Sequence, residues 1–452
     1  MHHILAVSLA LTLGLFLVNL SAAGQSPSST QQASTVTFAK HVAPILQNRC
    51  QACHRRDTFA PMSLVTYEEV RPWARSIKAK VVAREMPPWF IDKKIGVQHF
   101  SNDASLTDEE IGTIAAWVDG GALKGDAADM PPPRKFADQG RWDFGSHAEP
   151  DLVVNLPKDY IVPASGADHW PNILIDPKLT EDRYIAGVQI IPTKGYRSVH
   201  HIRTSLITPS DDAAHAGEVD SGAASVGDMG VFLNEYAIGK GADAFPDGSG
   251  RLIKAGTRIN VSFHLHPNGQ ETPMNIALGL KLHPRGYTPR HAIVSAIIDN
   301  FDLDIRPHEA NARFDAYHLL TKPTRLLSYQ PHMHNRGKAA CMEAIHPLPN
   351  GNSRVEPLNC ARFTFNWHLN YVYAEDSAPL LPAGTILHMI NWYDNTAANK
   401  ANPDPDAQLT FGGRTIDEMS GTWLSLYQMT EEEFKKEVEN RRARQHTVGS
   451  SK

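Results

Sequence analysis

The chain alternates polar and apolar side chains in the run Arg258-Ile259-Asn260-Val261-Ser262-Phe263. Successive side chains of a β-strand point to opposite faces, so this alternation predicts a strand with one buried face. Similar short runs, bounded by clusters of Pro, Gly, Asn and Asp, occur at residues 152–156, 184–191, 276–282 and 385–391. Short strands separated by turn residues predict antiparallel β-sandwiches rather than βαβ units.

Two pairs of histidines have the spacing of neighbours on one face of a strand. His264 and His266 directly follow the run at 258–263, and His332 and His334 lie in the segment Tyr329-Gln330-Pro331-His332-Met333-His334-Asn335-Arg336-Gly337-Lys338. Side chains two residues apart in a strand point the same way, so each pair can present two imidazoles to one metal ion. The alternative for either pair is two surface or hydrogen-bonded histidines.

A third histidine pair, His200 and His201, consists of adjacent residues. In a regular strand they would point to opposite faces, and only a bulge, or binding through different ring nitrogens, would bring both to one ion. No Asp or Glu competes close to the three clusters in the sequence, which favours a metal that prefers imidazole, namely copper, zinc or non-haem iron.

Residues 148–430 resemble the copper type II, ascorbate-dependent monooxygenases, the family of dopamine β-monooxygenase and peptidylglycine α-hydroxylating monooxygenase. The resemblance implies two copper ions and matches His200, His201 and His264 to the ligands of the first. It matches the ligands of the second to His332 and His334, which precede Arg336-Gly337-Lys338, and to Met419 in Asp417-Glu418-Met419. No role for His266 follows from it, and we expect His368 and His388 to be structural.

The resemblance also implies a division of labour. Copper at His332, His334 and Met419 would activate O2 and hydroxylate a C–H bond of a small organic substrate, because a thioether favours Cu(I). The all-histidine copper would supply an electron. The alternative is a non-catalytic copper-binding or electron-transfer protein with the same ligands. A sugar-binding or polymer-binding sandwich is a third possibility, but it leaves the histidine clusters unexplained.

A haem-attachment motif, Cys50-Gln51-Ala52-Cys53-His54, follows a predicted short helix at 42–49. The spacing lets two thiols attach to a haem c while His54 ligates the iron. A redox dithiol is the alternative, although the βαβ context that such sites occupy is missing. Met86 precedes two prolines and is our preferred second axial ligand, with Met62 as the other candidate. Residues 36–123, including a predicted capped helix at 106–121, resemble class I cytochrome c domains.

The N-terminus predicts export. Residues 4–20 are mostly apolar and uncharged, and small residues follow, so residues 1–23 predict a signal peptide, with an uncleaved membrane anchor as the alternative. In an oxidising compartment the two cysteines outside the haem motif, Cys341 and Cys360, are expected to form a disulfide. We therefore expect a periplasmic or secreted protein.

The chain of 452 residues is long enough for about three domains, and its net charge of -5 excludes a nucleic-acid partner. The predicted fold class is a small all-α cytochrome c domain followed by two all-β antiparallel jelly-roll sandwiches. The expected order is a signal peptide (1–23), a flexible spacer (24–35), the haem domain (36–125), a Pro-rich linker (126–147), two copper sandwiches (148–305 and 306–430) and a charged helical tail (431–452). The expected partners are the substrate, O2, and a periplasmic electron donor or ascorbate-like reductant, with the haem relaying electrons.

Overall fold

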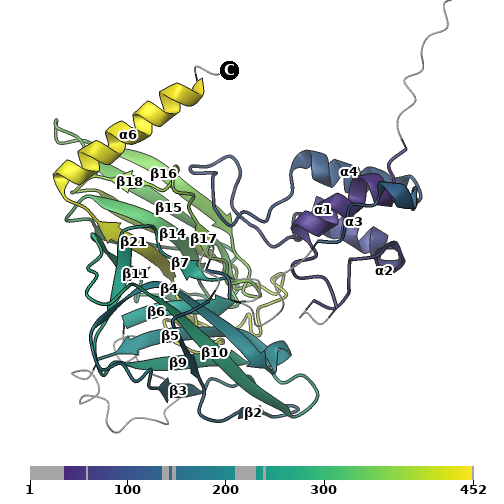
Figure 1. Cartoon of the computed structure of the whole chain (residues 1–452), viewed down its shortest axis with the longest axis horizontal. Helices are drawn as coiled ribbons and strands as arrows, with labels where there is room; N and C mark the ends of the chain where they lie inside the picture. Colours follow the sequence, from purple (N-terminus) through teal and green to yellow (C-terminus); the bar gives the residue numbers. More distant parts are fainter. Residues whose placement is uncertain are drawn as a thin grey trace, which may run out of the picture. The chain divides into compact units, whose positions relative to one another are not determined.

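The computed structural model describes residues 35–56, 60–134, 142–144, 149–208, 231–237 and 241–449 (Figure 1). The predicted signal peptide, the spacer up to residue 34 and parts of the predicted linker lie outside these residues. Within the described part of the chain, no helix is both long enough and apolar enough to cross a membrane.

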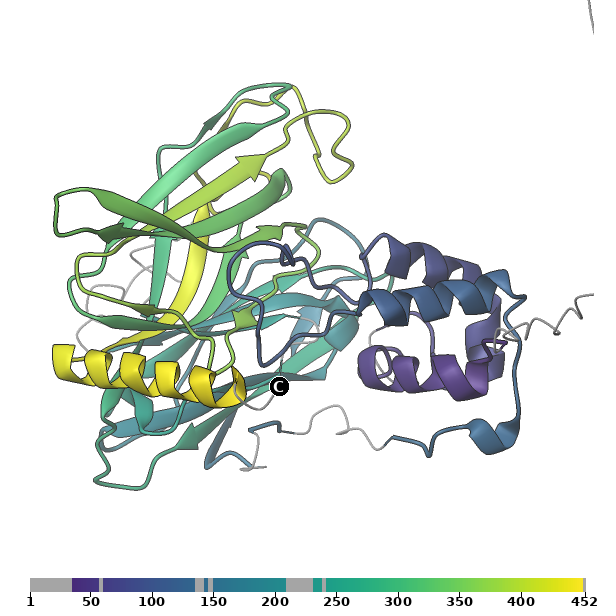
Figure 2. The ribbon, with the colours of Figure 1, turned by 90° about the horizontal axis from the view of Figure 1, so that it is seen from above.

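Short helices occupy the first part of the described chain, and Figure 2 shows them as one group in purple to blue. They are η1 (Phe38–Val42), α1 (Ala43–Arg49), α2 (Tyr67–Val70), η2 (Arg71–Trp73), α3 (Ala74–Val82), α4 (Asp108–Asp119) and η3 (Ala127–Asp129). Thr107 and Glu110 cap α4 reciprocally, each side chain bonding the other residue's backbone N–H. Leu46 and Trp117 are fully buried in the core that these helices enclose. The two helices predicted around 42–49 and 106–121 are confirmed.

Two antiparallel sheets enclose the first β core, in which Ile202 and Val261 pack with Val188 and Leu278. One sheet has the order β3 (Asn172–Ile175), β9 (Arg258–Leu265), β5 (Val199–Ile207) and β6 (Val231–Ala237). The other has the order β1 (Leu152–Asn155), β10 (Thr272–Leu282), β4 (Arg183–Lys194) and β8 (Ser249–Ile253), with β2 (Tyr160–Val162) beside β10 and β7 (Asp243–Ala244) beside β4. The helical turn η4 (Tyr196–Ser198) connects β4 to β5.

A second pair of sheets encloses the core that contains Met342, Leu387, Leu326 and Leu424. One sheet has the order β13 (Ala312–Leu319), β19 (Ile386–Tyr393), β15 (Gly337–Pro347) and β16 (Ser353–Arg362). The other contains β11 (His291–Asp299), β21 (Gly421–Gln428) and β14 (Thr324–His332), with β17 (Tyr371–Val372) and β18 (Leu380–Leu381) on β14; β12 (Asp304–Ile305) and β20 (Leu409–Thr410) pair separately. All five strand-like runs of the sequence lie in strands, which confirms the mostly β, antiparallel character of this part.

Strand pairing continues from one pair of sheets to the other. β8 pairs with β11 in parallel at only two positions, whereas β11 pairs with β21 in antiparallel register from Ile293↔Tyr427 to Asp299↔Gly421. β11 therefore joins the second sheet pair although it precedes residue 305, because its long register is with the last strand of the chain.

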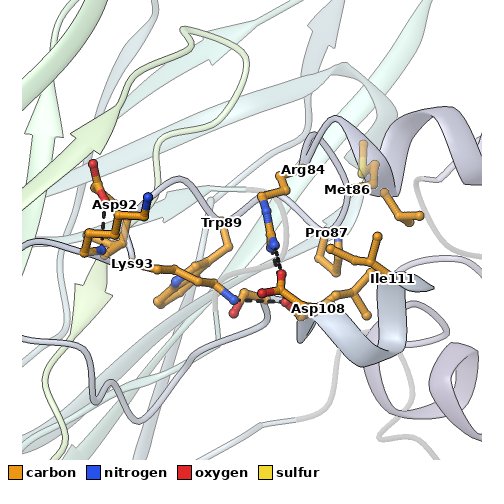
Figure 3. A pocket seen from close by; sticks show the side chains of 13 residues that line it. Arg84, Met86, Pro87, Trp89, Asp92, Lys93, Asp108 and Ile111 are labelled. Carbon is orange, nitrogen blue, oxygen red and sulfur yellow. Dashed lines mark hydrogen bonds and ion pairs between the residues drawn. The ribbon is translucent and has the colours of Figure 1, made fainter. Parts of the chain in front are cut away.

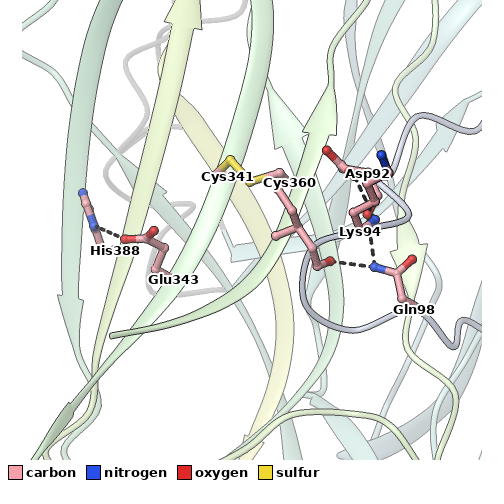
Figure 4. The surroundings of a disulfide bond; sticks show 8 residues. Asp92, Lys94, Gln98, Cys341, Glu343, Cys360 and His388 are labelled. Carbon is pink, nitrogen blue, oxygen red and sulfur yellow. Dashed lines mark hydrogen bonds and ion pairs between the residues drawn. A yellow bond between two sulfur atoms is a disulfide. The ribbon is translucent and has the colours of Figure 1, made fainter. Parts of the chain in front are cut away.

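The segment of residues 89–103, here called the arm, extends the edge of β16. Asp92 and Val97 donate backbone hydrogen bonds to Cys360 and Leu358, each at 2.8 Å. Figure 4 shows this part of the arm beside the disulfide between Cys341 and Cys360, which are register partners on β15 and β16. The predicted disulfide is thus present, and the arm covers an edge that would otherwise expose unpaired backbone groups.

The helix α6 (Glu431–Gly449) ends the described chain, as the charged periodic pattern predicted. Thr430 and Glu433 cap its start, and Phe434 packs against a cluster that includes Tyr427 and Met429. Arg441 donates a hydrogen bond to the Ala378 carbonyl at 2.7 Å. The tail is therefore docked onto the second sheet pair.

We expect the arm to contribute to the stability of the second core, since Trp89 is buried and its ring lies 4.9 Å from that of Tyr371. Trp89→Ala should lower the free energy of unfolding by about 3–5 kcal/mol, through lost burial and a residual cavity. Trp73→Ala, at a tryptophan that is 45% exposed, is the matched control and should change it by no more than about 0.5 kcal/mol. Equal effects in urea denaturation would show that the arm is not part of the core.

Candidate metal centre

A bulge in β5 brings His200 and His201 together. The register between β5 and β9 shifts between Val199, opposite Leu265, and His201, opposite His264. The extra residue at this point turns the two adjacent side chains toward each other, and their Nδ1 atoms lie 3.0 Å apart. Of the two arrangements that could bring both histidines to one ion, the bulge is present.

Asp168 holds His264 from outside. The Asp168 carboxylate contacts His264 Nε2 at 2.6 Å and His266 Nδ1 at 2.7 Å. The Trp170 ring stacks on His264 at 3.7 Å, and the rings of His200 and His201 lie 4.7 and 5.0 Å from it. Because Asp168 occupies Nε2, Nδ1 is the nitrogen of His264 that is left for a metal.

His266 lies apart from this group despite its same-face spacing. Its side chain is 69% exposed, whereas that of His264 is almost fully buried. It shares Asp168 with His264 and belongs to the surroundings of the candidate centre.

The second predicted group is assembled by β14 and β21. His332 is the register partner of Gly421, which places the segment 417–419 beside His332 and His334. The buried Glu418 carboxylate accepts the backbone N–H groups of His334 at 2.8 Å and Arg336 at 2.7 Å. His334 Nδ1 contacts the Asp417 carbonyl at 3.1 Å, which leaves Nε2 for a metal.

Met419 follows directly in the same segment. It is 8% exposed, and its carbonyl accepts a hydrogen bond of 2.7 Å from the Tyr393 hydroxyl. The structure thus brings the two predicted ligand segments together, because Glu418, the residue before Met419, bonds the turn after His334. Burial raises the pKa of Glu418 to about 8, against the opposing effect of the two N–H groups.

His368, which the sequence led us to expect as structural, lies between the two groups. Its ring is 4.7 Å from that of His201, 5.8 Å from that of His200 and 5.3 Å from that of His332. Candidate ligand atoms of His200, His201 and His368 all lie within 4.8 Å of one another, so these three residues could hold a metal ion. A lone histidine in a segment without regular structure carries no spacing signal, which is why sequence reasoning missed it.

The buried imidazole nitrogens of this cluster could bind a metal. Among the described residues, His264 Nδ1, His332 Nδ1 and both ring nitrogens of His368 are buried without a hydrogen-bond partner. Burial lowers the pKa of His200 and of His334 to about 4, and that of His332 to about 3, with neighbouring histidines adding to the effect for His200 and His332. Neutral imidazole is the form that binds metals, and an unpartnered buried nitrogen is costly unless something binds it.

The haem motif begins at the end of α1. His54 Nδ1 contacts the Met62 carbonyl at 3.2 Å, which leaves Nε2 for an iron. Cys50 and Cys53 are not in a disulfide, and burial raises the pKa of the Cys50 thiol to about 12. A raised thiol pKa argues against a reactive dithiol, because the thiolate is the nucleophile.

Met86 lines a cavity of about 350 Å³ together with Pro87, Trp89 and Ile111 (Figure 3). Arg84 and Asp108 form an ion pair at its wall. None of the three residues of the haem motif that would bind the haem lines this cavity. The choice between Met86 and Met62 as the second axial ligand therefore stays a prediction.

No protein-family model matches the chain, and no curated protein is similar to it. The chain is similar at low level to the major capsid protein P2 from Bacteriophage PM2, with 9% identity, a TM-score of 0.26, and coverage of 61% of this chain and 96% of that one. It is also similar to Bacillus subtilis oxalate decarboxylase, with 6% identity, a TM-score of 0.12, and coverage of 62% and 78%. Similarities this weak support no conclusion about fold or function.

Acid should destabilise the metal-free protein, since its buried histidines are neutral when folded. An unfolded histidine binds a proton below about pH 6.5, whereas folded His332 does so only near pH 3. In this interval the unfolded state binds more protons, so stability falls as the pH falls. The free energy of unfolding of His332→Leu should therefore fall less steeply with falling pH than that of the wild type, by up to about 1.4 kcal/mol per pH unit. Urea unfolding of metal-free protein between pH 7 and 4 tests it, and parallel curves for the two proteins would contradict it.

Proposed function

We propose that this chain is an exported copper-dependent monooxygenase that hydroxylates a C–H bond of a small organic substrate with O2. One observation carries the proposal. Six histidine rings form one group beside the segment that carries Met419, and four of their buried nitrogens lack a hydrogen-bond partner. The six are His200, His201, His264, His332, His334 and His368. In this proposal His200, His201 and His264 hold one copper, and His332, His334 and Met419 hold the other. The surrounding sheets would be the two copper jelly-roll sandwiches of the resemblance.

Copper bound at these residues would supply the one-electron chemistry that O2 activation needs, with the thioether of Met419 favouring Cu(I). The protein's own contribution is to fix the ligands. Asp168 orients His264, and Glu418 fixes the turn that carries His334 next to Met419. The Phe365 ring, stacked on His200 at 5.3 Å, helps to exclude water from the histidines.

We further propose that residues 36–125 form a class I cytochrome c domain. Cys50 and Cys53 would bind the haem covalently, His54 would be one axial ligand and Met86 the other. A haem c changes oxidation state by one electron at a time, as each copper does, so it would relay electrons from a periplasmic donor or ascorbate-like reductant. The disulfide between Cys341 and Cys360 is consistent with such a compartment.

The copper assignment is tested by metal analysis of protein exported by a haem-maturing host. We expect two coppers and one iron per chain, and a loss of about one copper in both His200→Ala and Met419→Ala, because each variant lacks one ligand. His388→Ala is the control, since this buried histidine bonds Asp315 and Glu343 instead. Zinc in place of copper, or iron alone, would contradict the proposal.

Turnover separates the enzyme from a non-catalytic copper protein. The copper-loaded chain with ascorbate should consume O2 faster when a substrate is added from a screen of small organic molecules, with one oxygen atom of ¹⁸O2 found in the product. Met419→Ala should abolish this reaction. Copper binding without incorporation of ¹⁸O into any compound would favour the electron-transfer alternative.

The haem assignment predicts that the pigment stays attached to the denatured chain. Cys50→Ala with Cys53→Ala should remove the covalent haem and its absorbance, because both thioether bonds are lost. Met86→Ala and Met62→Ala should differ, with only Met86→Ala lowering the reduction potential of the haem, because a methionine ligand raises that potential. A wild-type chain without covalent haem would contradict the assignment.

A further inference from the structure

The two histidine groups form one continuous set of rings in the described structure. His368 is the connection, with ring centres at 4.7 Å from His201 and 5.3 Å from His332. Two imidazoles bound to one metal through nitrogens at about 2.0–2.1 Å have ring centres roughly 5 Å apart. The spacing on both sides of His368 is therefore that of neighbouring metal ligands.

Strand pairing explains this position. Tyr329 on β14 is the register partner of Tyr371 on β17, and the two strands are antiparallel. His332 lies three residues after Tyr329, and His368 lies three residues before Tyr371, so this pairing brings their two segments together, and the two rings lie 5.3 Å apart. His368 is thus positioned by the same sheet that positions His332.

The environment of His368 differs from that of the other buried histidines of the second sheet pair. His388 contacts carboxylates at 2.6 and 3.1 Å through its two ring nitrogens, and His346 contacts Glu356 at 2.9 Å. His368 is 3% exposed and has no hydrogen bond at either nitrogen, with the nearest Glu235 oxygen 3.9 Å from Nδ1. A structural histidine would have a partner, and His368 has instead the rings of two metal groups.

We propose that His368 is a metal ligand and that it makes the two copper sites one dinuclear centre. His368 would join His200, His201 and His264 at one ion, and its ring lies 5.3 Å from that of His332. That ion would then lie close enough to the one held by His332, His334 and Met419 for the two to interact magnetically. This inference rests on the proposed function for the presence of two coppers. It adds one ligand, His368, and a short separation between the two ions, neither of which follows from the resemblance.

The test is titration of the full chain with Cu(II), followed by analysis of bound copper and of the electron paramagnetic resonance signal. We expect two coppers per chain with a signal well below that of two isolated Cu(II) ions, because neighbouring spins couple. His368→Ala should weaken one copper by more than the roughly 10- to 100-fold that loss of a supporting hydrogen bond causes, and the remaining copper should give the full signal of an isolated ion.

His388→Ala is again the matched control and should keep both coppers and the reduced signal. Thermal unfolding of the metal-free variants shows whether each is folded, and His368→Gln replaces His368→Ala if the smaller side chain prevents folding. Two coppers with the full signal of isolated ions, or a titration unchanged by the His368 variants, would overturn the dinuclear centre while leaving the two-copper proposal intact. A wild-type chain that binds no copper would overturn both.

Discussion

Burial of uncharged imidazoles is the constraint around which the β part of this chain is organised. Four ring nitrogens in the described cluster lack a partner. Each such group costs about 1–3 kcal/mol, so together they approach the net stability of a typical domain, about 5–15 kcal/mol. The sheets on both sides must supply enough apolar burial to offset this cost until a metal binds. A metal that bound these nitrogens would therefore also add to folding stability.

Two carboxylates connect the cluster to the rest of the fold in different ways. Asp168 bonds His264 at the ring and leaves the opposite nitrogen directed inward, whereas Glu418 bonds backbone N–H groups and shapes a turn. Both contacts restrict the histidines on the side away from the cluster, so their orientation would not depend on a metal. Neither acid is close in sequence to the histidine that it orients: Asp168 precedes His264 by about a hundred residues, and Glu418 follows His334 by nearly as many.

The local parts of the structure could be predicted from the sequence, but the way they come together could not. Alternation at 258–263 predicted β9, and the spacing of His332 and His334 predicted two imidazoles in one group, because both patterns depend only on strand geometry. The role of His368 depends on the pairing of Tyr329 with Tyr371, which is a contact between distant strands. The same spacing wrongly suggested that His264 and His266 form a pair. β9 ends at Leu265, so His266 lies beyond the strand and is exposed, whereas His264 is buried.

The pairing of β14 with β17 makes the length of one short segment critical. Only two residues, Leu369 and Asn370, separate His368 from Tyr371, and β17 itself pairs with β14 at just two positions. A single inserted residue between His368 and Tyr371 would lengthen this segment by up to about 3.3 Å and could move the ring away from His332. The spacing between Tyr371 and His368 would therefore distinguish chains that could form the proposed centre from chains that keep the fold alone.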